Sequence, residues 1–476
     1  MPWPDLGAPV AMRRVAVVAP VDATRAVLVA VAEKGVVELE RAAVSVPGPA
    51  SQALQRARRD RPGARSSPVT SWQAPDLDVL EAGHELEALA GETEIEALDA
   101  EAVRQGSVAA WAGWAPAAAV VPLAERLAPL GGAVVPLPAP AGVDPPTLVE
   151  GRGATRAFQP LVDTYTTIGY RDLNPAAWAG LSYVVMFGMM FGDVGHGLVL
   201  IAGGFLLAAG TLAPLRRLRH LAPFVVGAGV ASTGFGLAYG EFFGPTGVVP
   251  TLWLRPLDHA TALLAVAVAA GAGLLAVSWV FGTVNRWREG GAGRALLAVS
   301  GFAGGALYLG LACAGLGWYR HWGPVELLGA GVFAAGLAAG GAGLYAESGR
   351  RAAGAVQAGV GLFDAVLRIG TNTVSFARLA AFGLTHAALS GIVWEATTGL
   401  WHRGAPWGAL AAVVFLAGNA LAFAIEGLVA GIQALRLEYY EMFSRIFAVE
   451  GHRFRPWHLD VAPDPVESEE ARCSPG

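Results

Sequence analysis

The sequence predicts a mainly α-helical, polytopic membrane protein. We expect about eight transmembrane helices, the last two long and tilted, and a small N-terminal cytoplasmic α/β domain. Three observations support this fold class. The 476-residue chain is 54% hydrophobic and only 15% charged, with 63 glycines, a composition typical of membrane proteins. Apolar windows long enough, or nearly long enough, to span a bilayer follow one another from Ala176 onward. Arginine-rich loops alternate with loops that carry single arginines.

Residues 1–150 are predicted to form the cytoplasmic α/β domain. Two short strand–helix–strand patterns, over Arg14–Glu40 and Val108–Leu137, are expected to build one lobe from both ends of this region. Between them, residues from about 47 to 75 are rich in Pro, Arg and Ser, which indicates a flexible linker. Residues from about 76 to 103 are acidic and predict an exposed helix or helical hairpin, with or without a specific role.

A connector over residues 151–175 leads to the predicted transmembrane domain, residues 176–447, and a cytoplasmic tail follows over residues 448–476. The first two windows are short and meet at Gly192 and Asp193. The last two exceed the roughly 20 residues that a helix needs to cross, so we expect them to tilt or to extend beyond the bilayer. The windows are Ala176–Phe191, Val194–Gly210, Leu221–Phe243, Ala260–Thr283, Ala295–Gly317, Val325–Tyr345, Leu362–Thr397 and Trp407–Phe443.

Loop charge predicts the orientation of these spans. The loops after the second, fourth and sixth windows are rich in arginine, and such loops stay in the cytoplasm. An even number of spans then places both termini in the cytoplasm of a multi-pass cell-membrane protein. Abundant Ala, Gly and Arg, with Lys34 as the only lysine, indicate a bacterial source. The arginines concerned are Arg216, Arg217, Arg219, Arg286, Arg288, Arg294, Arg350 and Arg351.

Several classes of function are excluded or disfavoured. The net charge of −5 is spread along the chain and no basic stripe with aromatic residues occurs, so we expect no nucleic-acid partner. A P-loop needs a Gly-Lys-Ser/Thr sequence that the only lysine does not provide. Cys313 and Cys473 lack a metal-type spacing partner. We therefore predict no catalytic residue, metal or cofactor in this chain, and we find no signal-peptide pattern at its start.

Arg378 is the most informative residue of the sequence. It lies in an apolar predicted span, where an arginine at the helix centre costs roughly 2.5–3.5 kcal/mol on insertion scales. The guanidinium does not lose its proton to escape this cost. Helical spacing puts Thr371, Ser375 and Thr385 on roughly the same face, which indicates a polar stripe. A functional charge and a structural arginine paired within the chain are the two alternatives.

Other polar residues of the last two spans are further candidates. His386 follows Arg378 by about two helical turns. Glu426 is either an ion-relay group, since a carboxylate exchanges protons, or the structural partner of an arginine. Arg436 lies ten residues later and either lines the same face or marks the cytoplasmic interface. Gln433 lies between these two residues.

A glycine-rich segment joins the first two windows. Within Phe187–Gly197, Asp193 is placed to cap the second span and His196 follows one turn later. Glycines at such a turn allow close packing. We expect a structural motif here.

Together these segments resemble the family of membrane subunit a, also called subunit I or the 116 kDa subunit, of V-type and V/A-type rotary ATPases. The similarity is strongest from about Pro145 to Trp457. Three motifs in the same order, on a chain with eight predicted spans, make it specific. The segments that carry it are Met186–Gly197, Ser375–Leu379, Leu384–Ser390, Phe423–Gly427, Leu435–Glu438 and Phe447–Trp457.

The resemblance implies a non-catalytic stator subunit beside a proteolipid c-ring whose subunits carry a mid-membrane carboxylate. Arg378 matches the essential arginine that releases the proton from this carboxylate, and Arg436 matches a second arginine. Glu426 and His386 match polar residues of two ion half-channels, for which Thr371, Ser375, Thr385 and Gln433 are candidate lining residues. Peripheral-stalk and central-stalk subunits, the lipid bilayer and transported H⁺ or Na⁺ are the implied partners.

One departure from the family is the short link between the two α/β patterns, since relatives carry a much longer cytoplasmic arm. The short link favours, as an alternative, a non-pumping anchor paralogue. A stand-alone secondary ion transporter is a separate alternative, but the sequence shows no convincing internal repeat of the kind that such transporters often carry. We expect the acceptor of Arg378 to be a carboxylate on another subunit, with Glu426 as the alternative inside this chain.

Overall fold

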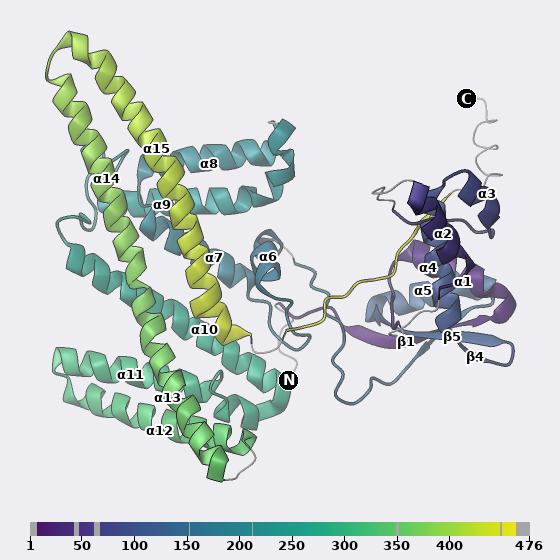
Figure 1. Ribbon diagram of the computed structural model, residues 1–476. Helices are drawn as coiled ribbons and strands as arrows, with labels where there is room; N and C mark the ends of the chain where they lie inside the picture. The colour runs from purple at the N-terminus through teal and green to yellow at the C-terminus, as the bar shows by residue number, and fades with distance from the viewer. Residues whose placement is uncertain are drawn as a thin grey trace. The chain divides into compact units, whose positions relative to one another are not determined.

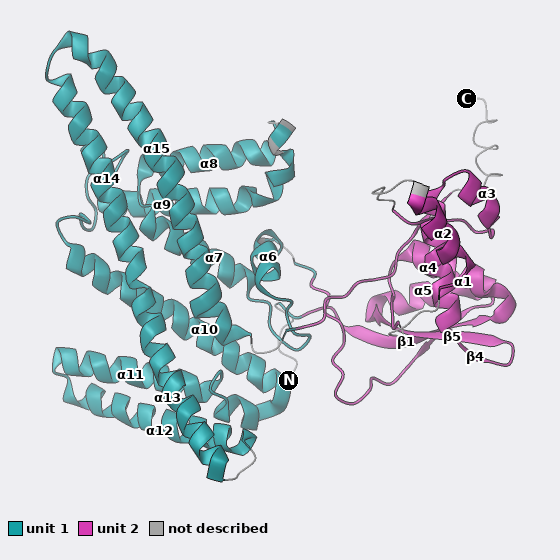
Figure 2. Cartoon of the chain, in the orientation of Figure 1, with its two compact units in different colours: residues 1–8, 150–450 teal, residues 9–149, 451–476 magenta. Residues whose placement is uncertain are grey.

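The chain divides into two compact units, which are described separately (Figures 1 and 2). Unit 1 comprises Met1–Ala8 and Glu150–Glu450, and unit 2 comprises Pro9–Val149 and Gly451–Gly476. This computed structural model describes residues 7–41, 47–60, 67–151, 153–211, 213–348, 352–447 and 450–462.

Unit 2 contains an antiparallel sheet formed by both predicted strand–helix–strand patterns. Its strand order is β2-β5-β1-β6, and β4 pairs with residues 108–110 at the start of β5. β1 pairs with β5 along its whole length, and Val15 lies opposite Gly113. Val15 and Val17 are buried at alternate positions, as expected for a strand that covers a core on one face. The strands are β1 (Met12–Pro20), β2 (Glu38–Leu39), β4 (Val103–Gln105), β5 (Val108–Pro116) and β6 (Ala133–Pro136).

Helices complete the core of unit 2. α1 (Thr24–Lys34) and α5 (Val120–Leu127) bury Val27, Val31 and Leu123 in one cluster with the sheet valines. α1 ends at Gly35, whose backbone is left-handed, with φ of 56°, a conformation that glycine adopts without strain.

The segment between the two patterns differs from the predicted flexible linker. Pro49–Asp60 forms helix α2, while residues 61–66 lie outside the described residues. Ala53, Leu54 and Ala57 of α2 recur at helical spacing and pack in one cluster with apolar residues of α3 and α4. This apolar stripe is obscured by the Pro, Arg and Ser content of the segment. The acidic stretch that follows contains α3 (Leu77–Ala82) and α4 (Leu86–Glu101), after the short strand β3 (Val69–Thr70).

The described part of the C-terminal tail belongs to unit 2. β7 (Asp460–Val461) pairs in parallel with β3. The Trp457 backbone N–H donates to the Val37 carbonyl at 2.8 Å, and its indole N–H donates to Glu94 Oε2, also at 2.8 Å. A side chain that buries an aromatic ring and satisfies its N–H is a strong anchor. The tail is therefore an integral part of the α/β fold.

Unit 1 is helical. Among the described residues, six helices are long and apolar enough to cross a membrane, while α7 and α8 are apolar but shorter. The structure thus supports six of the eight predicted spans by length, because α7 has 15 residues and α8 has 16. The helices are α6 (Ala154–Tyr165), α7 (Ala176–Met190), α8 (Val194–Ala209), α9 (Ala222–Tyr239), α10 (Ala260–Leu297), α11 (Phe302–Arg320), α12 (Gly323–Glu347), α13 (Ala352–Ser375), α14 (Ala377–Trp401), α15 (Ala405–Leu437) and α16 (Ser444–Ile446).

Two irregularities shape the C-terminal helices. The predicted seventh span is divided at Phe376 into α13 and α14. Phe376 is fully buried and packs on Gly271 of α10, where a Cβ atom would overlap the phenyl ring. After α15, Glu438–Phe443 forms a π-helix, which holds more residues in each turn and so rotates the following side chains around the axis.

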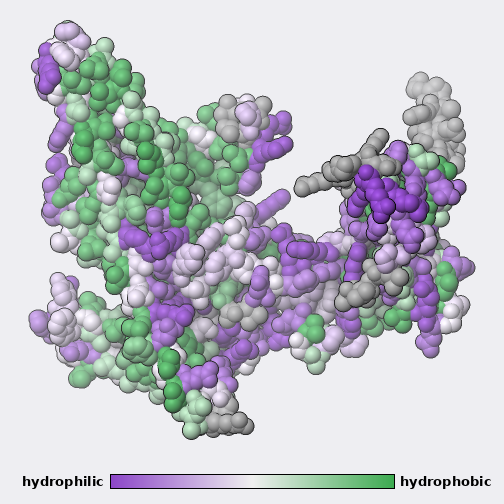
Figure 3. All heavy atoms as spheres, viewed as in Figure 1, coloured by the Kyte–Doolittle hydropathy of each residue, from purple (hydrophilic) through white to green (hydrophobic). Residues whose placement is uncertain are grey.

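Apolar side chains both fill and surround unit 1. Its largest core cluster joins α7, α10, α14 and α15 through residues such as Met186, Met190 and Leu379. Phe363 and Leu416 are among the large apolar residues with about two thirds of their surface exposed, at 66% and 67%. Hydrophobic side chains cover much of this unit in Figure 3, whereas hydrophilic ones predominate on unit 2. An apolar outer surface of this kind suits contact with lipid.

Candidate functional site

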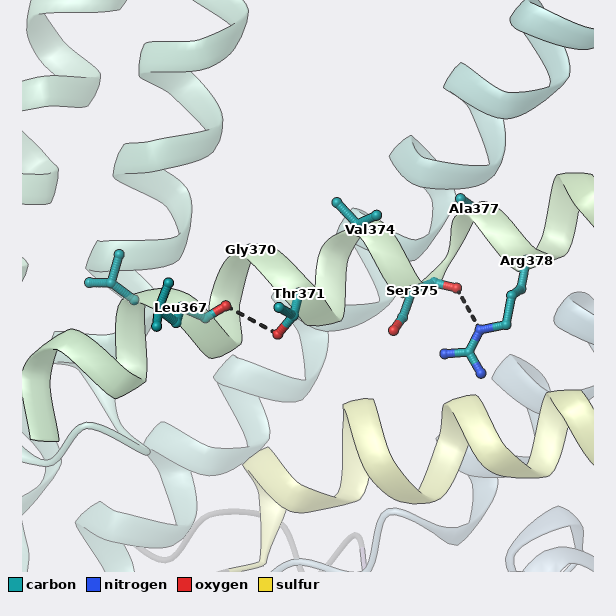
Figure 4. A pocket seen from close by; sticks show the side chains of 8 residues that line it. Leu367, Gly370, Thr371, Val374, Ser375, Ala377 and Arg378 are labelled. Atoms are coloured by element: carbon teal, nitrogen blue, oxygen red, sulfur yellow. Dashed lines mark hydrogen bonds between the residues drawn. The ribbon is translucent and has the colours of Figure 1, made fainter.

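Arg378 lies two residues beyond the break between α13 and α14. The break frees the Ser375 carbonyl from the regular helical pattern, and Arg378 Nε donates to it at 3.1 Å (Figure 4). The local irregularity therefore positions the guanidinium and removes one cost of interrupting the helix. Arg378 Nη1 is buried and makes no hydrogen bond to a described residue.

The partner of Arg378 within the chain is Glu441. Arg378 Nη2 donates to Glu441 Oε1 at 2.9 Å, and the two side chains are 24% and 6% exposed. Glu426, which the sequence offered only as the alternative inside this chain, pairs with His386 instead, so that alternative is wrong. The physical reason is the π-helix, because Glu441 lies within it and its direction does not follow regular helical spacing.

Arg378 opens onto an apolar groove of about 580 Å³. Thr371 and Ser375 line the same groove, which agrees with the predicted polar stripe, and Leu367 and Val374 supply apolar walls (Figure 4). The Thr371 hydroxyl donates to the Leu367 carbonyl at 3.1 Å, so it is satisfied within its own helix. Thr385, expected on this face, is exposed on α14 and is not among the lining residues.

A second polar pair joins α14 to α15. His386 Nδ1 and Glu426 Oε2 lie 2.5 Å apart, and the side chains are only 3% and 12% exposed. His386 Nε2 and Glu426 Oε1 make no hydrogen bond to any described residue. His386 lies eight positions after Arg378 on α14, or about 12 Å along a helix. The structure thus connects two of the predicted site residues directly and places them beyond the arginine.

Asp193 and His196 lie against this second pair. Asp193 is the N-cap of α8, and its Oδ1 accepts from the His196 backbone N–H at 2.9 Å, as predicted for a capping residue. Its carboxylate also accepts from the backbone N–H groups of Phe243, at 3.0 Å, and Gly244, at 2.9 Å. The ring of His196 has its centroid 5.6 Å from that of His386, and the backbone of Asn419 also faces it.

Gln433 and Arg436 lie near the other end of α15. Gln433 is half-buried, and its side-chain oxygen has no hydrogen-bond partner among the described residues. Arg436 is exposed and contributes to the electrostatic potential at Glu441. The predicted residues therefore form two polar groups, one around Arg378 and Glu441 and one around His386 and Glu426.

Comparisons with known proteins relate the chain to one family. The model of the V-type ATPase 116 kDa subunit family matches residues 113–214. The A-type ATP synthase subunit I of Halobacterium salinarum is 28% identical over 386 residues, covering 66% of this chain and 51% of that protein. Subunit I of the A-type ATP synthase of Pyrococcus horikoshii is 25% identical over 308 residues, covering 63% and 45%. The V-type proton ATPase subunit a1 of Arabidopsis thaliana is 35% identical over 107 residues, covering 21% and 13%.

The chain belongs to the subunit a/I family. It is a membrane protein with multiple candidate spans. Members of this family are the non-catalytic membrane subunits of rotary ATPases. The chain spans about half the length of the archaeal relatives that it matches.

Three further residues of this family member complete the two polar groups and were missed from the sequence. Glu438 is fully buried in the π-helix and accepts from the Ser182 hydroxyl of α7 at 2.8 Å. Glu241, just after α9, is 6% exposed and lies within electrostatic reach of His386 and Glu426. Glu441 pairs with Arg378. A signal was present, since each is an acidic residue at the end of an apolar segment.

Proposed function

We propose that this chain is the stator membrane subunit of a V/A-type rotary ATPase, which couples rotation of a proteolipid c-ring to transport of H⁺ or Na⁺. The observation that carries the proposal is the position of Arg378. A permanent cation lies at the mouth of an open groove with exposed apolar walls, in the middle of a membrane-spanning helix pair. Such a groove offers a surface on which a second set of apolar helices can pack.

The chemistry follows from the charge of the arginine. A rotor carboxylate that faces lipid is neutral, because an ionised carboxylate is too costly in hydrocarbon. Beside Arg378 the ionised form becomes favourable, so the carboxylate releases its proton there. Arg378 keeps its own charge throughout. It therefore acts as an electrostatic gate between two pathways and not as a proton relay.

Glu441 is a second acceptor for the arginine when no rotor carboxylate is near. An unpaired guanidinium at this depth would carry an uncompensated charge, which the 2.9 Å contact with Glu441 prevents. The rotor carboxylate then exchanges with Glu441 as the partner of Arg378. This refines the sequence-based expectation of a partner on another subunit, because the chain supplies a resting partner of its own.

The two polar groups supply the two half-channels in this proposal. Loop charge puts the start of α13 and the end of α15 on the cytoplasmic side, so Glu441, Glu438, Gln433 and Arg436 line the cytoplasmic half-channel. Asp193, His196, Glu241, His386 and Glu426 line the opposite one. Buried polar atoms without a hydrogen-bond partner in the described part of the chain recur in both groups, as expected of groups that exchange ions or contact water.

The short helices α7 and α8 fit the same topology. A helix of 15 residues extends about 22 Å, less than the roughly 30 Å hydrocarbon thickness. We propose that the pair enters the membrane from the cytoplasm and turns at Asp193 near the depth of His386. Six full spans and eight spans are both even, so both termini and unit 2 remain cytoplasmic, where unit 2 meets the stalk subunits.

The test is an Arg378→Ala substitution in the assembled complex. We expect ATP-driven acidification of inverted membrane vesicles to be abolished while the complex still assembles. Arg368→Ala is the matched control, because Arg368 lies on α13, is 66% exposed and, among the described residues, forms its ion pair with Asp364 on its own helix. That variant should retain pumping. Persisting ATP-driven acidification in Arg378→Ala would refute the stator proposal, and its absence in the unmodified complex would favour a non-pumping anchor.

A further inference from the structure

A compact set of metal-ligand side chains lies at the turn between α7 and α8. Asp193, His196 and His386 each offer one ligand atom, and these atoms lie within 4.8 Å of one another. All three side chains are at most 3% exposed. The set joins the α7–α8 turn to α14, two segments that are distant in the sequence.

The imidazole nitrogens of this set have few protein partners. Neither ring nitrogen of His196, nor Nε2 of His386, makes a well-formed hydrogen bond to a described residue. The nearest polar neighbours of the His196 ring are Asp193, whose Oδ1 lies 3.4 Å from Nδ1, and the backbone of Asn419. Leaving such a buried polar atom unpaired costs about 1–3 kcal/mol. A neutral imidazole carries a lone pair on one of its two ring nitrogens. The two neighbouring buried histidines therefore offer one lone pair each, which points to a ligand that accepts them.

The surroundings of His386 match those of a metal-ligating histidine. Such a histidine directs its second ring nitrogen at a carboxylate, which fixes the orientation of the ring and raises the basicity of the ligating nitrogen. His386 Nδ1 contacts Glu426 Oε2 at 2.5 Å, and this leaves Nε2 as the ligating atom. Asp193 is oriented in the same way by three backbone N–H groups.

The donor set selects the class of ion. Two imidazoles and one carboxylate form a three-ligand set that Zn²⁺ accepts with a fourth position open. Ca²⁺ and Mg²⁺ require mostly oxygen ligands, and this set has too few. Ligand atoms around a tetrahedral zinc lie roughly 3.3 Å apart, so small side-chain rotations would close the set. The carboxyls of Asp193 and Glu426 both act electrostatically on Glu241, and acidic groups around the set also favour a cation.

We propose that Asp193, His196 and His386 form a binding site for a zinc-class divalent cation that cross-links the α7–α8 turn to α14. The sequence did not predict it, because the ligands follow no local spacing motif. If the proposed function holds, a bound ion also occupies His386 and stops ion transport. Zinc binding by the chain does not depend on that function, so zinc binding and ion transport are tested in separate experiments.

The experiment measures metal binding by the full-length purified chain in detergent, without the rest of the complex. Zn²⁺ is titrated into the metal-free chain by calorimetry. We expect one ion per chain, at least about 100-fold weaker binding in His196→Gln and His386→Gln, and about 10–100-fold weaker binding in Glu426→Gln, whose residue only orients a ligand. His402→Gln is the matched control, because His402 is exposed at the end of the same helix, and it should bind like the unmodified chain.

X-ray absorption of zinc bound to the unmodified chain gives a second measurement that needs no variant. We expect two imidazole nitrogens at about 2.0–2.1 Å and at least one oxygen ligand. The proposal is overturned if the unmodified chain binds no stoichiometric zinc. It is also overturned if fewer than two imidazoles are seen, or if folded His386→Gln and His402→Gln bind zinc equally well.

Discussion

The pair between Arg378 and Glu441 gives the most direct prediction about this molecule. Its two atoms lie 2.9 Å apart, and both side chains are largely buried. The perturbation is a double-mutant cycle with Arg378→Gln, Glu441→Gln and the combination of the two. Such a cycle isolates the pair, because the bond from Arg378 to the Ser375 carbonyl is lost equally with and without Glu441.

The expected coupling follows from the geometry. Two unit charges at this distance attract by about 6 kcal/mol at an effective dielectric constant of about 20. The cost of burying both ions, several kcal/mol each in a dry interior, cancels much of this attraction. We therefore expect a coupling free energy of about 1.5–3 kcal/mol, the range of hydrogen bonds that involve charged groups.

The assay is unfolding of the full-length chain in mixed detergent and SDS, followed by tryptophan fluorescence. The same cycle on Arg368 and Asp364 is the control, since that pair has a similar contact of 2.8 Å but side chains that are 66% and 54% exposed. Its coupling should not exceed about 0.5 kcal/mol. Equal couplings for the two pairs, or a value near zero for Arg378 and Glu441, would refute the reasoning.

Three further predictions use the same unfolding assay or proteolysis. Burial is the main cause that raises the pKa of Asp172 to about 7, and the negative charge of Glu289 is the second. The free energy of unfolding should therefore fall as pH rises from about 4 to about 7. Asp172→Asn should be about 1–3 kcal/mol more stable than the unmodified chain at pH 8 but not at pH 4. Gly271→Ala should cost about 1–3 kcal/mol by overlap with Phe376, and an unchanged unfolding midpoint would contradict that contact. Trp457→Ala should cost about 3–5 kcal/mol in unit 2 and expose residues 451–462 to protease; an equally resistant segment would mean that the indole does not anchor it.

Much of the architecture was predictable because it depends on local patterns. The strand alternation around Val15 and the Asp193 cap are periodic or short-range signals, and the structure contains both. The polar stripe of Thr371, Ser375 and Arg378 also survives, since these residues precede or immediately follow the helix break. Thr385 lies beyond the break, where regular helical spacing counted from α13 no longer applies.

The features that could not be predicted are those set by tertiary packing. Phe376 interrupts its helix because Gly271, more than 100 residues earlier, accepts its ring. Glu441 contacts Arg378 because the π-helix that follows α15 rotates its side chains away from regular helical spacing. His196 and His386 become neighbours only when two separate helical hairpins pack together. Periodic patterns in the sequence predict local structure, but they do not show which distant residues come into contact.

The attachment of the C-terminal segment to unit 2 has a consequence for how the protein is made. β3 acquires its partner β7, and the α/β core acquires Trp457, only after every helix of unit 1 has been synthesised. The strands and helices of unit 2 that are synthesised before unit 1 are thus among the last to reach their final structure. Completion of unit 2 therefore requires that translation has passed the whole of unit 1. A chain truncated before residue 451 would leave the edge of β3 unpaired, a feature that favours aggregation and removal.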